Sequence, residues 1–132
     1  MSSGANMHRD IEVARSQCLA MRALIIHHLG GRENGEALGK LREMSRNAAA
    51  AIDDVDCKSL LASVEGDGAD LFSRFGHLKW ATTHVSGAFF LRLQILRELD
   101  AFDARLIQLE ATRNAAAARS TANSSSDRRS PG

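Results

Sequence analysis

The chain has 132 residues, of which 44% are hydrophobic and 25% are charged, a size and composition typical of one globular domain. Its 17 Lys and Arg residues nearly balance its 16 Asp and Glu residues, so the formal net charge is only +1. This balance provides no bulk attraction to nucleic acids or to anionic membranes, and it argues against either as a partner.

The residual positive charge is concentrated near the C-terminus. Arg113, Arg119, Arg128 and Arg129 stand against Asp127 alone, which gives this segment a charge of +3 and leaves −2 on the rest of the chain. Four dispersed arginines without aromatic residues between them bind phosphates only weakly. We therefore interpret the segment as a solvated tail and rank a basic-tail nucleic-acid binder third among the functions considered.

The two cysteines, Cys18 and Cys57, lie far apart in the sequence and form no Cys-x-x-Cys pair. This spacing predicts reduced, buried thiols rather than a disulfide scaffold or a zinc site. The N-terminus lacks the apolar core of a signal peptide, and the longest apolar runs, Ala23 to Ile26 and Gly87 to Leu91, are too short to cross a bilayer. These features predict a cytoplasmic protein with no membrane partner.

The first predicted helix runs from His8 to Leu29, with Asn6 as its N-cap. Apolar residues recur there at spacings of three and four, which is the pattern of an amphipathic helix. These residues are Ile11, Ala14, Cys18, Met21, Ile25 and Leu29. Gly30 and Gly31 tolerate a positive φ, so they are expected to end the helix.

Two shorter helices are predicted next. One runs from about Glu36 to Ile52 and is followed by an acidic interruption at Asp53, Asp54 and Asp56. Because Asp disfavours helix interiors but suits N-caps, Asp56 is expected to cap a third helix that runs from Cys57 to Val64. The sequence Gly66-Asp67-Gly68 is expected to end that helix.

The last predicted helix is the longest. Asp67 is expected to cap it, and no proline or turn cluster interrupts the chain from there to about Arg113. Its second half carries a regular apolar stripe, made of Leu91, Ile95, Leu99, Phe102, Leu106 and Leu109. A helix from His77 to Arg113 would be about 55 Å long, against about 33 Å for the first helix. The second and third helices could cover its two halves in a closed monomer, but a sustained apolar stripe is also typical of self-associating helices. We prefer the second interpretation, in which the stripe is an interaction face and the protein is a homodimer.

The chain is therefore predicted to be all-α. We expect an antiparallel helical bundle of four to five helices with one long C-terminal helix, formed by residues 1–119. Residues 120–132 are almost entirely small and polar, and they include the only proline, Pro131. Such a segment buries too little apolar surface to offset the entropy of ordering, so it is expected to be a disordered tail.

Histidines are the side chains most suited to reactive chemistry here, because they titrate near neutral pH. His77 and His84 are seven residues apart and share one helix face with Ala81 and Ala88. Such a pair suits a phosphoacceptor or a metal ligand, but small neighbours favour close helix packing instead. The segment Gly76-His77-Leu78-Lys79-Trp80 departs from the His-x-Leu-Lys-Gly pattern of histidine-phosphotransfer domains, because the leucine and lysine are one residue too close and tryptophan replaces glycine.

No other catalytic or cofactor motif occurs. The chain lacks phosphate-binding glycine loops, Glu-x-x-His metal pairs and a nucleophile elbow, so no catalytic residue, metal or cofactor is predicted. We expect a non-enzymatic helical protein-interaction module, such as an adaptor, chaperone or regulatory protein, whose partner the sequence does not identify. The alternative is a histidine-phosphotransfer-like or metal-binding helical bundle that uses His77 or His84.

Overall fold

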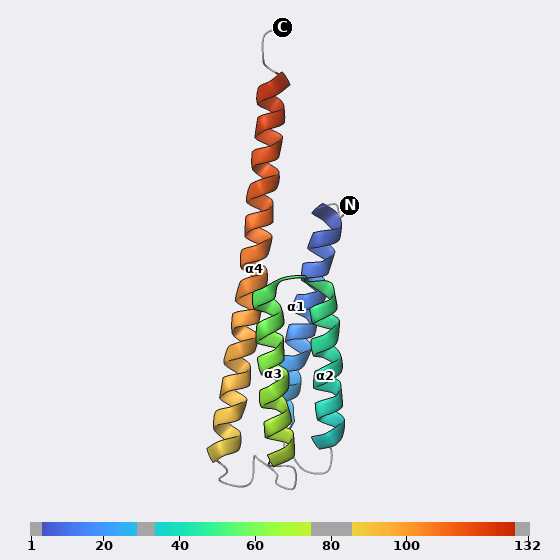
Figure 1. Ribbon diagram of the computed structural model, residues 1–132, viewed down its shortest axis with the longest axis vertical. Helices are drawn as coiled ribbons and strands as arrows, with labels where there is room; N and C mark the ends of the chain where they lie inside the picture. Colours follow the sequence, from blue (N-terminus) through green and yellow to red (C-terminus); the bar gives the residue numbers. More distant parts are fainter. Residues whose placement is uncertain (1–3, 29–33, 75–85, 129–132) are drawn as a thin grey trace.

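The computed structural model describes residues 4–28, 34–74 and 86–128, and all secondary structure in these ranges is helical. Four helices follow one another: α1 (Gly4–His27), α2 (Asn34–Ala51), α3 (Val55–Arg74) and α4 (Ser86–Arg128). They run alternately up and down, and each packs against its neighbours in sequence, with α1 and α4 closing the ring (Figure 1). The predicted all-α antiparallel bundle with a long C-terminal helix is confirmed.

The core lies along the axis of this ring. The apolar stripe predicted for the first helix is buried from Ile11 to Ile25, and α2 adds Ala37, Leu41 and Ala48. Facing them, α3 contributes Cys57, Leu61, Val64, Leu71 and Phe72, and α4 contributes Ala88, Ile95, Leu99, Phe102 and Leu106. Helical periodicity places these residues on one side of each helix, and their burial supplies most of the favourable free energy of folding.

The boundaries of the first helices differ from the prediction in two respects. Helix α1 begins at Gly4, so Asn6 lies inside it rather than capping it. The cap of α3 is Asp54 rather than Asp56, because Oδ2 of Asp54 accepts a hydrogen bond from the backbone N–H of Cys57 at 3.0 Å. An N-cap side chain bonds two or three residues ahead, and only Asp54 stands at that distance from Cys57. Leu29 lies outside the described residues.

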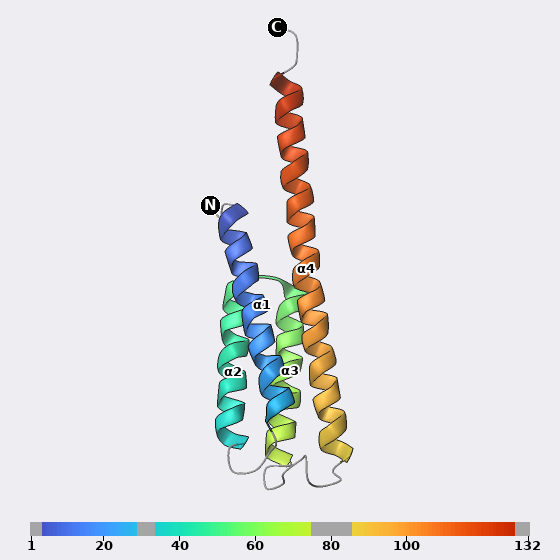
Figure 2. The same cartoon turned by 180° about the vertical axis from the view of Figure 1, so that it is seen from behind.

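The prediction that Gly66-Asp67-Gly68 ends a helix is wrong, since α3 continues through these residues to Arg74. The predicted single helix from Asp67 to Arg113 is also wrong. Asp67 lies within α3, whereas α4 begins at Ser86 and runs antiparallel to α3 (Figures 1 and 2). Glycine lowers helix propensity by about 1 kcal/mol, a cost that packing against α2 and α4 can offset.

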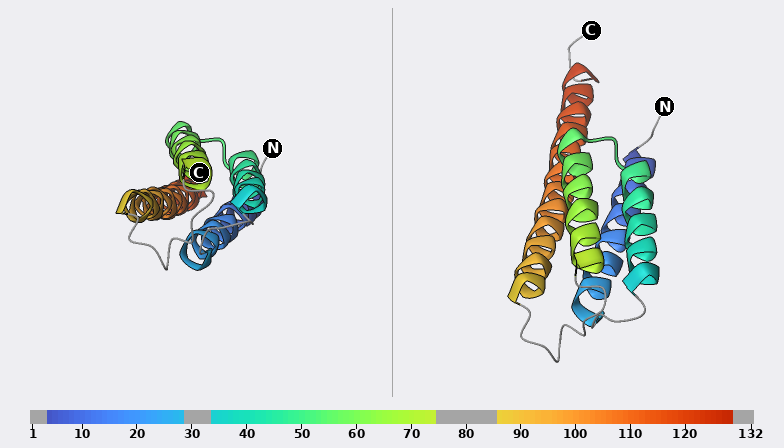
Figure 3. Two further views of the ribbon diagram at one scale, coloured as in Figure 1. Left: turned by 90° about the horizontal axis from the view of Figure 1, so that it is seen from below. Right: turned by 60° about the horizontal axis from the view of Figure 1, so that its bottom comes forward.

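The predicted length mismatch is confirmed. Helix α4 has 43 residues, while α2 has 18 and α3 has 20. The C-terminal part of α4 extends past the ends of the other helices (Figures 1 and 3), and residues 114–120 are exposed. Across the described ranges, no helix is both long and apolar enough to cross a membrane.

Two glycines of α3 provide a matched test of packing against α2. A Cβ atom on Gly66 would meet nothing within 4 Å, whereas one on Gly68 would overlap the Cδ2 atom of the fully buried Leu41. We expect Gly66→Ala to raise the free energy of unfolding by about 0.5–1 kcal/mol and Gly68→Ala to lower it by about 1–3 kcal/mol. Urea denaturation of both variants checks this, and a stabilised Gly68→Ala would contradict the close approach of α2 and α3.

The disorder of residues 120–132 stays a prediction. The helical backbone of α4 reaches Arg128, but a helical segment that no neighbour packs against depends on its own propensity and is marginal in water. We expect truncation after Arg119 to leave the melting temperature unchanged within about 1 °C, because the core ends with Leu106 and the partly buried Leu109. Calorimetry of the truncated chain checks this, and a loss of several degrees would show that the segment packs on the bundle.

Candidate functional site

The stripe predicted as an interaction face lies inside the bundle. Ile95, Leu99, Phe102 and Leu106 are fully buried, while Leu91 and Leu109 are partly buried against the same core. Helices α1 and α3 of the same chain flank α4 and cover this stripe. A partner cannot reach it while the bundle is closed, so any interaction face of α4 must lie elsewhere on the helix.

A second set of large apolar side chains lies on the outer side of α4. Phe89 and Ile107 are 56% and 49% exposed, and the partly buried Leu96 lies between them. Phe89 and Ile107 are separated by five helical turns and Phe89 and Leu96 by about two, so the three share one side of the helix. Arg92, one turn from Phe89, reaches the C-terminal carbonyls of α1. This outer side of α4 therefore lies next to α1.

Helix α1 adds apolar side chains to the same surface. Leu19 is 67% exposed and Ile26 is 40% exposed, and the two lie two turns apart on one side of α1. Between them in sequence, Arg22 makes an ion pair with Asp100 of α4. We call the surface formed by Leu19, Ile26, Phe89, Leu96 and Ile107 the α1–α4 outer face. Figure 2 shows the two helices that carry it.

Two ion pairs at the centre of this face join a basic residue of α1 to an acidic residue of α4. Arg15 of α1 donates from Nε to Oδ1 of Asp103 in α4 at 2.9 Å, and Arg22 of α1 pairs with Asp100 of α4. The central part of the face therefore has a basic half on α1 and an acidic half on α4. All four side chains are at least one-third exposed, so these pairs contribute little to stability but set the local potential.

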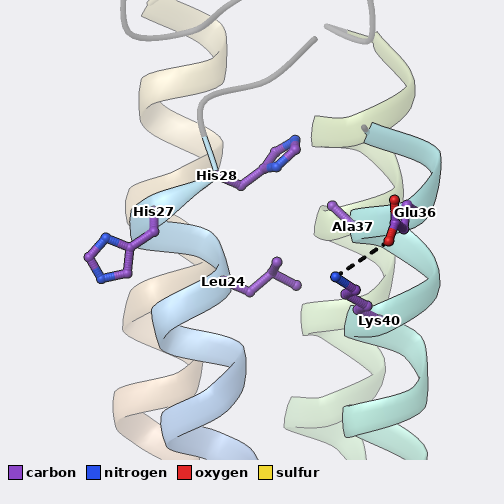
Figure 4. A pocket seen from close by; sticks show the side chains of 6 residues that line it. All are labelled: Leu24, His27, His28, Glu36, Ala37 and Lys40. Carbon is purple, nitrogen blue, oxygen red and sulfur yellow. Dashed lines mark ion pairs between the residues drawn. The ribbon is translucent and has the colours of Figure 1, made fainter. Parts of the chain in front are cut away.

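A small pocket of about 220 Å³ lies between the C-terminal end of α1 and the start of α2 (Figure 4). Its two histidines do not converge, since the His27 ring points away from α2. His28 instead makes a 2.5 Å hydrogen bond from Nε2 to Oδ1 of Asn34 and packs edge-on against Phe72. Lys40 is paired with Glu36 at 3.5 Å. Among the described residues that line it, the pocket thus presents no pair of groups arranged for acid–base chemistry.

A larger cleft of about 530 Å³ lies at the opposite end of the bundle, where α4 leaves its neighbours. Ile11, Ile52 and Leu109 supply apolar lining, and Asp10 and Asp54 contribute carboxylates. Arg105 holds the pKa of Asp54 well below its usual range through two hydrogen bonds. Because Asp54 stays ionised and bound, it cannot serve as a proton donor in this cleft.

Both cysteines are free and buried, as predicted. The Cys18 thiol donates to the carbonyl oxygen of Leu99 at 3.3 Å, and burial raises its pKa to about 11. Burial and then the neighbouring Asp54 raise the pKa of Cys57 to about 12. Since the thiolate is the reactive form, neither cysteine is suited to nucleophilic catalysis.

His77 and His84 lie outside the described residues, so the histidine alternative stays a prediction. Of the side chains that the structure does describe, no three His, Cys, Asp or Glu residues form a group that could hold a metal ion. Comparison with protein-family models, with curated proteins and with solved structures finds no match. The functional assignment therefore rests on the geometry of this chain.

Sequence reasoning missed the outer face because it followed a single stripe of α4. The sequence does contain a signal. Phe89, Leu96 and Ile107 are spaced by seven and eleven residues, so they form a second apolar row on the otherwise polar side of the helix. Two apolar sides on one helix indicate that it is covered from two directions. Which of the two sides enters the core is decided by the other helices and is not visible in α4 alone.

The pKa of one partly buried carboxyl group at the α3–α4 contact is strongly shifted. Glu98 of α4 lies beside Asp67 of α3, whose Oδ2 accepts a hydrogen bond from Nε2 of Gln94 at 3.2 Å. Oε2 of Glu98 is buried and has no hydrogen-bond partner among the described residues. Burial, followed by the contact with Asp67, raises the pKa of Glu98 to about 8. At neutral pH the folded protein therefore keeps Glu98 protonated.

This perturbation predicts a pH-dependent stability. Between about pH 4.5 and 8 the unfolded chain releases the Glu98 proton while the folded chain retains it, so the free energy of unfolding falls as the pH rises. We expect Glu98→Gln to match the wild type near pH 4.5 and to exceed it by about 1–3 kcal/mol at about pH 8.5. Urea denaturation across this range provides the measurement.

Asp67→Asn serves as the control for the cause of the shift. It removes the neighbouring carboxylate but leaves the partial burial of Glu98 unchanged, so the pH dependence should become weaker without disappearing. Parallel stability curves for the wild type and Glu98→Gln would show that Glu98 titrates normally in the folded protein.

Proposed function

We propose that the protein is a non-enzymatic helical interaction module, an adaptor, chaperone or regulatory protein, whose protein partner binds the α1–α4 outer face. The observation that carries this proposal is the exposure of Leu19 and Phe89, more than half of each side chain, on one side of a closed bundle. Clustered exposed apolar side chains bordered by charges are typical of protein interfaces.

The chemistry of the described residues supports a binding role over a catalytic one. Both thiols have raised pKa values, and the most strongly perturbed carboxyl group, Glu98, lies at a helix contact and not in a pocket. The free thiols also support a cytoplasmic location, where cysteines stay reduced. Among the described residues that line the two cavities, no nucleophile lies beside a base, an arrangement that acyl or phosphoryl transfer would require.

The proposal is tested by placing a photo-crosslinking amino acid at Leu19 and, as a control, at Val55. Val55 is 82% exposed but lies on α3, away from the outer face. We expect crosslinking in cells from position 19 and not from position 55. The crosslinked protein is then identified, purified and titrated against the wild type and two variants, Leu19→Glu and Val55→Glu.

Leu19→Glu is expected to weaken binding of the purified partner at least about tenfold, because it places a charge in an apolar contact. The fold should survive, since Arg15 and Arg22 lie four and three residues away on the same helix and can pair with the new carboxylate. Val55→Glu should leave the affinity unchanged. Equal losses in both variants, or no protein crosslinked at position 19, would contradict the proposal.

A further inference from the structure

We infer that the α1–α4 outer face binds the same face of a second copy of this chain, with α1 of each copy lying against α4 of the other. This inference rests on the proposed function and names its partner. It follows from three properties of the face: its exposed apolar side chains, the separation of the charges at its centre between two helices, and the neutrality of that centre.

The apolar side chains come from both helices, so a contact over this face buries residues of α1 and α4 together. Leu19 and Ile26 belong to α1, and Phe89 and Ile107 belong to α4. In a symmetric dimer, both copies bury these same four residues. The interface thus buries eight large apolar side chains, although each chain contributes only four.

The charges select one orientation of the second copy. A twofold axis parallel to the helices places α1 of one copy opposite α4 of the other at the same height. Arg15 and Arg22 then approach Asp103 and Asp100 of the second copy while keeping their own partners. A twofold axis perpendicular to the helices would place α1 on α1 and α4 on α4, which brings like charges together.

The same charges favour a second copy over an unrelated partner. Two arginines and two aspartates make the centre of the face neutral overall, so a uniformly acidic or basic partner gains no net attraction there. A partner must instead carry an acidic row and a basic row side by side, as far apart as two neighbouring helices. A second copy of this chain carries that arrangement, and symmetry brings it into register.

The first experiment measures oligomeric state by analytical ultracentrifugation across a concentration series of the full chain. We expect a reversible dimer for the wild type, a dissociation constant at least about tenfold higher for Leu19→Glu, and no change for Val55→Glu. Melting temperatures at a concentration where all three proteins are monomeric should agree, which excludes unfolding as the cause. A monomeric wild type, or a dimer that Leu19→Glu leaves intact, would overturn the inference.

A second experiment tests the orientation by disulfide formation between single-cysteine additions. Glu12 and Ile107 are exposed at the same height of the face, because Arg15 pairs with Asp103 and His8 with Glu110 on either side of them. A mixture of Glu12→Cys and Ile107→Cys should form a mixed disulfide, and neither variant alone should form one. Cys18 and Cys57 are buried and should not compete. A disulfide in either variant alone would indicate like helices in contact and overturn the inference.

The two proposals fail in distinguishable ways. If the wild type is monomeric but Leu19→Glu still weakens binding of a different crosslinked protein, the inference fails and the proposed function stands. If the wild type dimerises through another surface and position 19 crosslinks no protein, both fail.

Discussion

One charged contact, the bidentate pair of Asp54 and Arg105, links the start of α3 to α4 at the end of the bundle where α4 leaves its neighbours. Nε and Nη2 of Arg105 donate to the two carboxylate oxygens of Asp54 at 3.1 and 2.9 Å, and Oδ2 also caps α3 through the N–H of Cys57. A bidentate pair of this kind is directional, so it fixes the start of α3 against the side of α4. Because the pKa of Asp54 is lowered, its contribution to stability is present above about pH 4 and is lost in stronger acid.

This contact holds α3 against the flank of α4 that adjoins the buried stripe. With α3 on one flank and α1 on the other, the stripe from Ile95 to Leu106 is buried, and α2 completes the ring without touching α4. Arg92 strengthens the α1 flank by donating to the carbonyls of Ile25 and Ile26 in the last turn of α1, where helix carbonyls commonly need partners from outside the helix. Within the described ranges, no further helix covers the outer side of α4.

Much of the fold could be predicted because its determinants are local. Spacings of three and four residues located the buried side of α1 correctly, from Ile11 to Ile25. The predicted end of the third helix was wrong because Gly66 and Gly68 were interpreted as a helix stop. In the structure, Gly68 instead allows α3 to approach Leu41 of α2 closely. The cap was misplaced by two residues because the choice between Asp54 and Asp56 depends on Arg105, about fifty residues away. Contacts of this range leave no local pattern.

The candidate site was harder to predict, because exposure is a property of the whole bundle. The regular stripe of α4 is the natural choice for an interface when the helix is considered alone, and the closed ring converts it into core. The residues left outside, Leu19 and Phe89 among them, are spaced less regularly and are separated by charges. A ring of four helices covers each helix from two flanks only. When a helix has apolar residues on two sides, one ring can therefore bury only one of them. The second side must be solvated or covered by another chain.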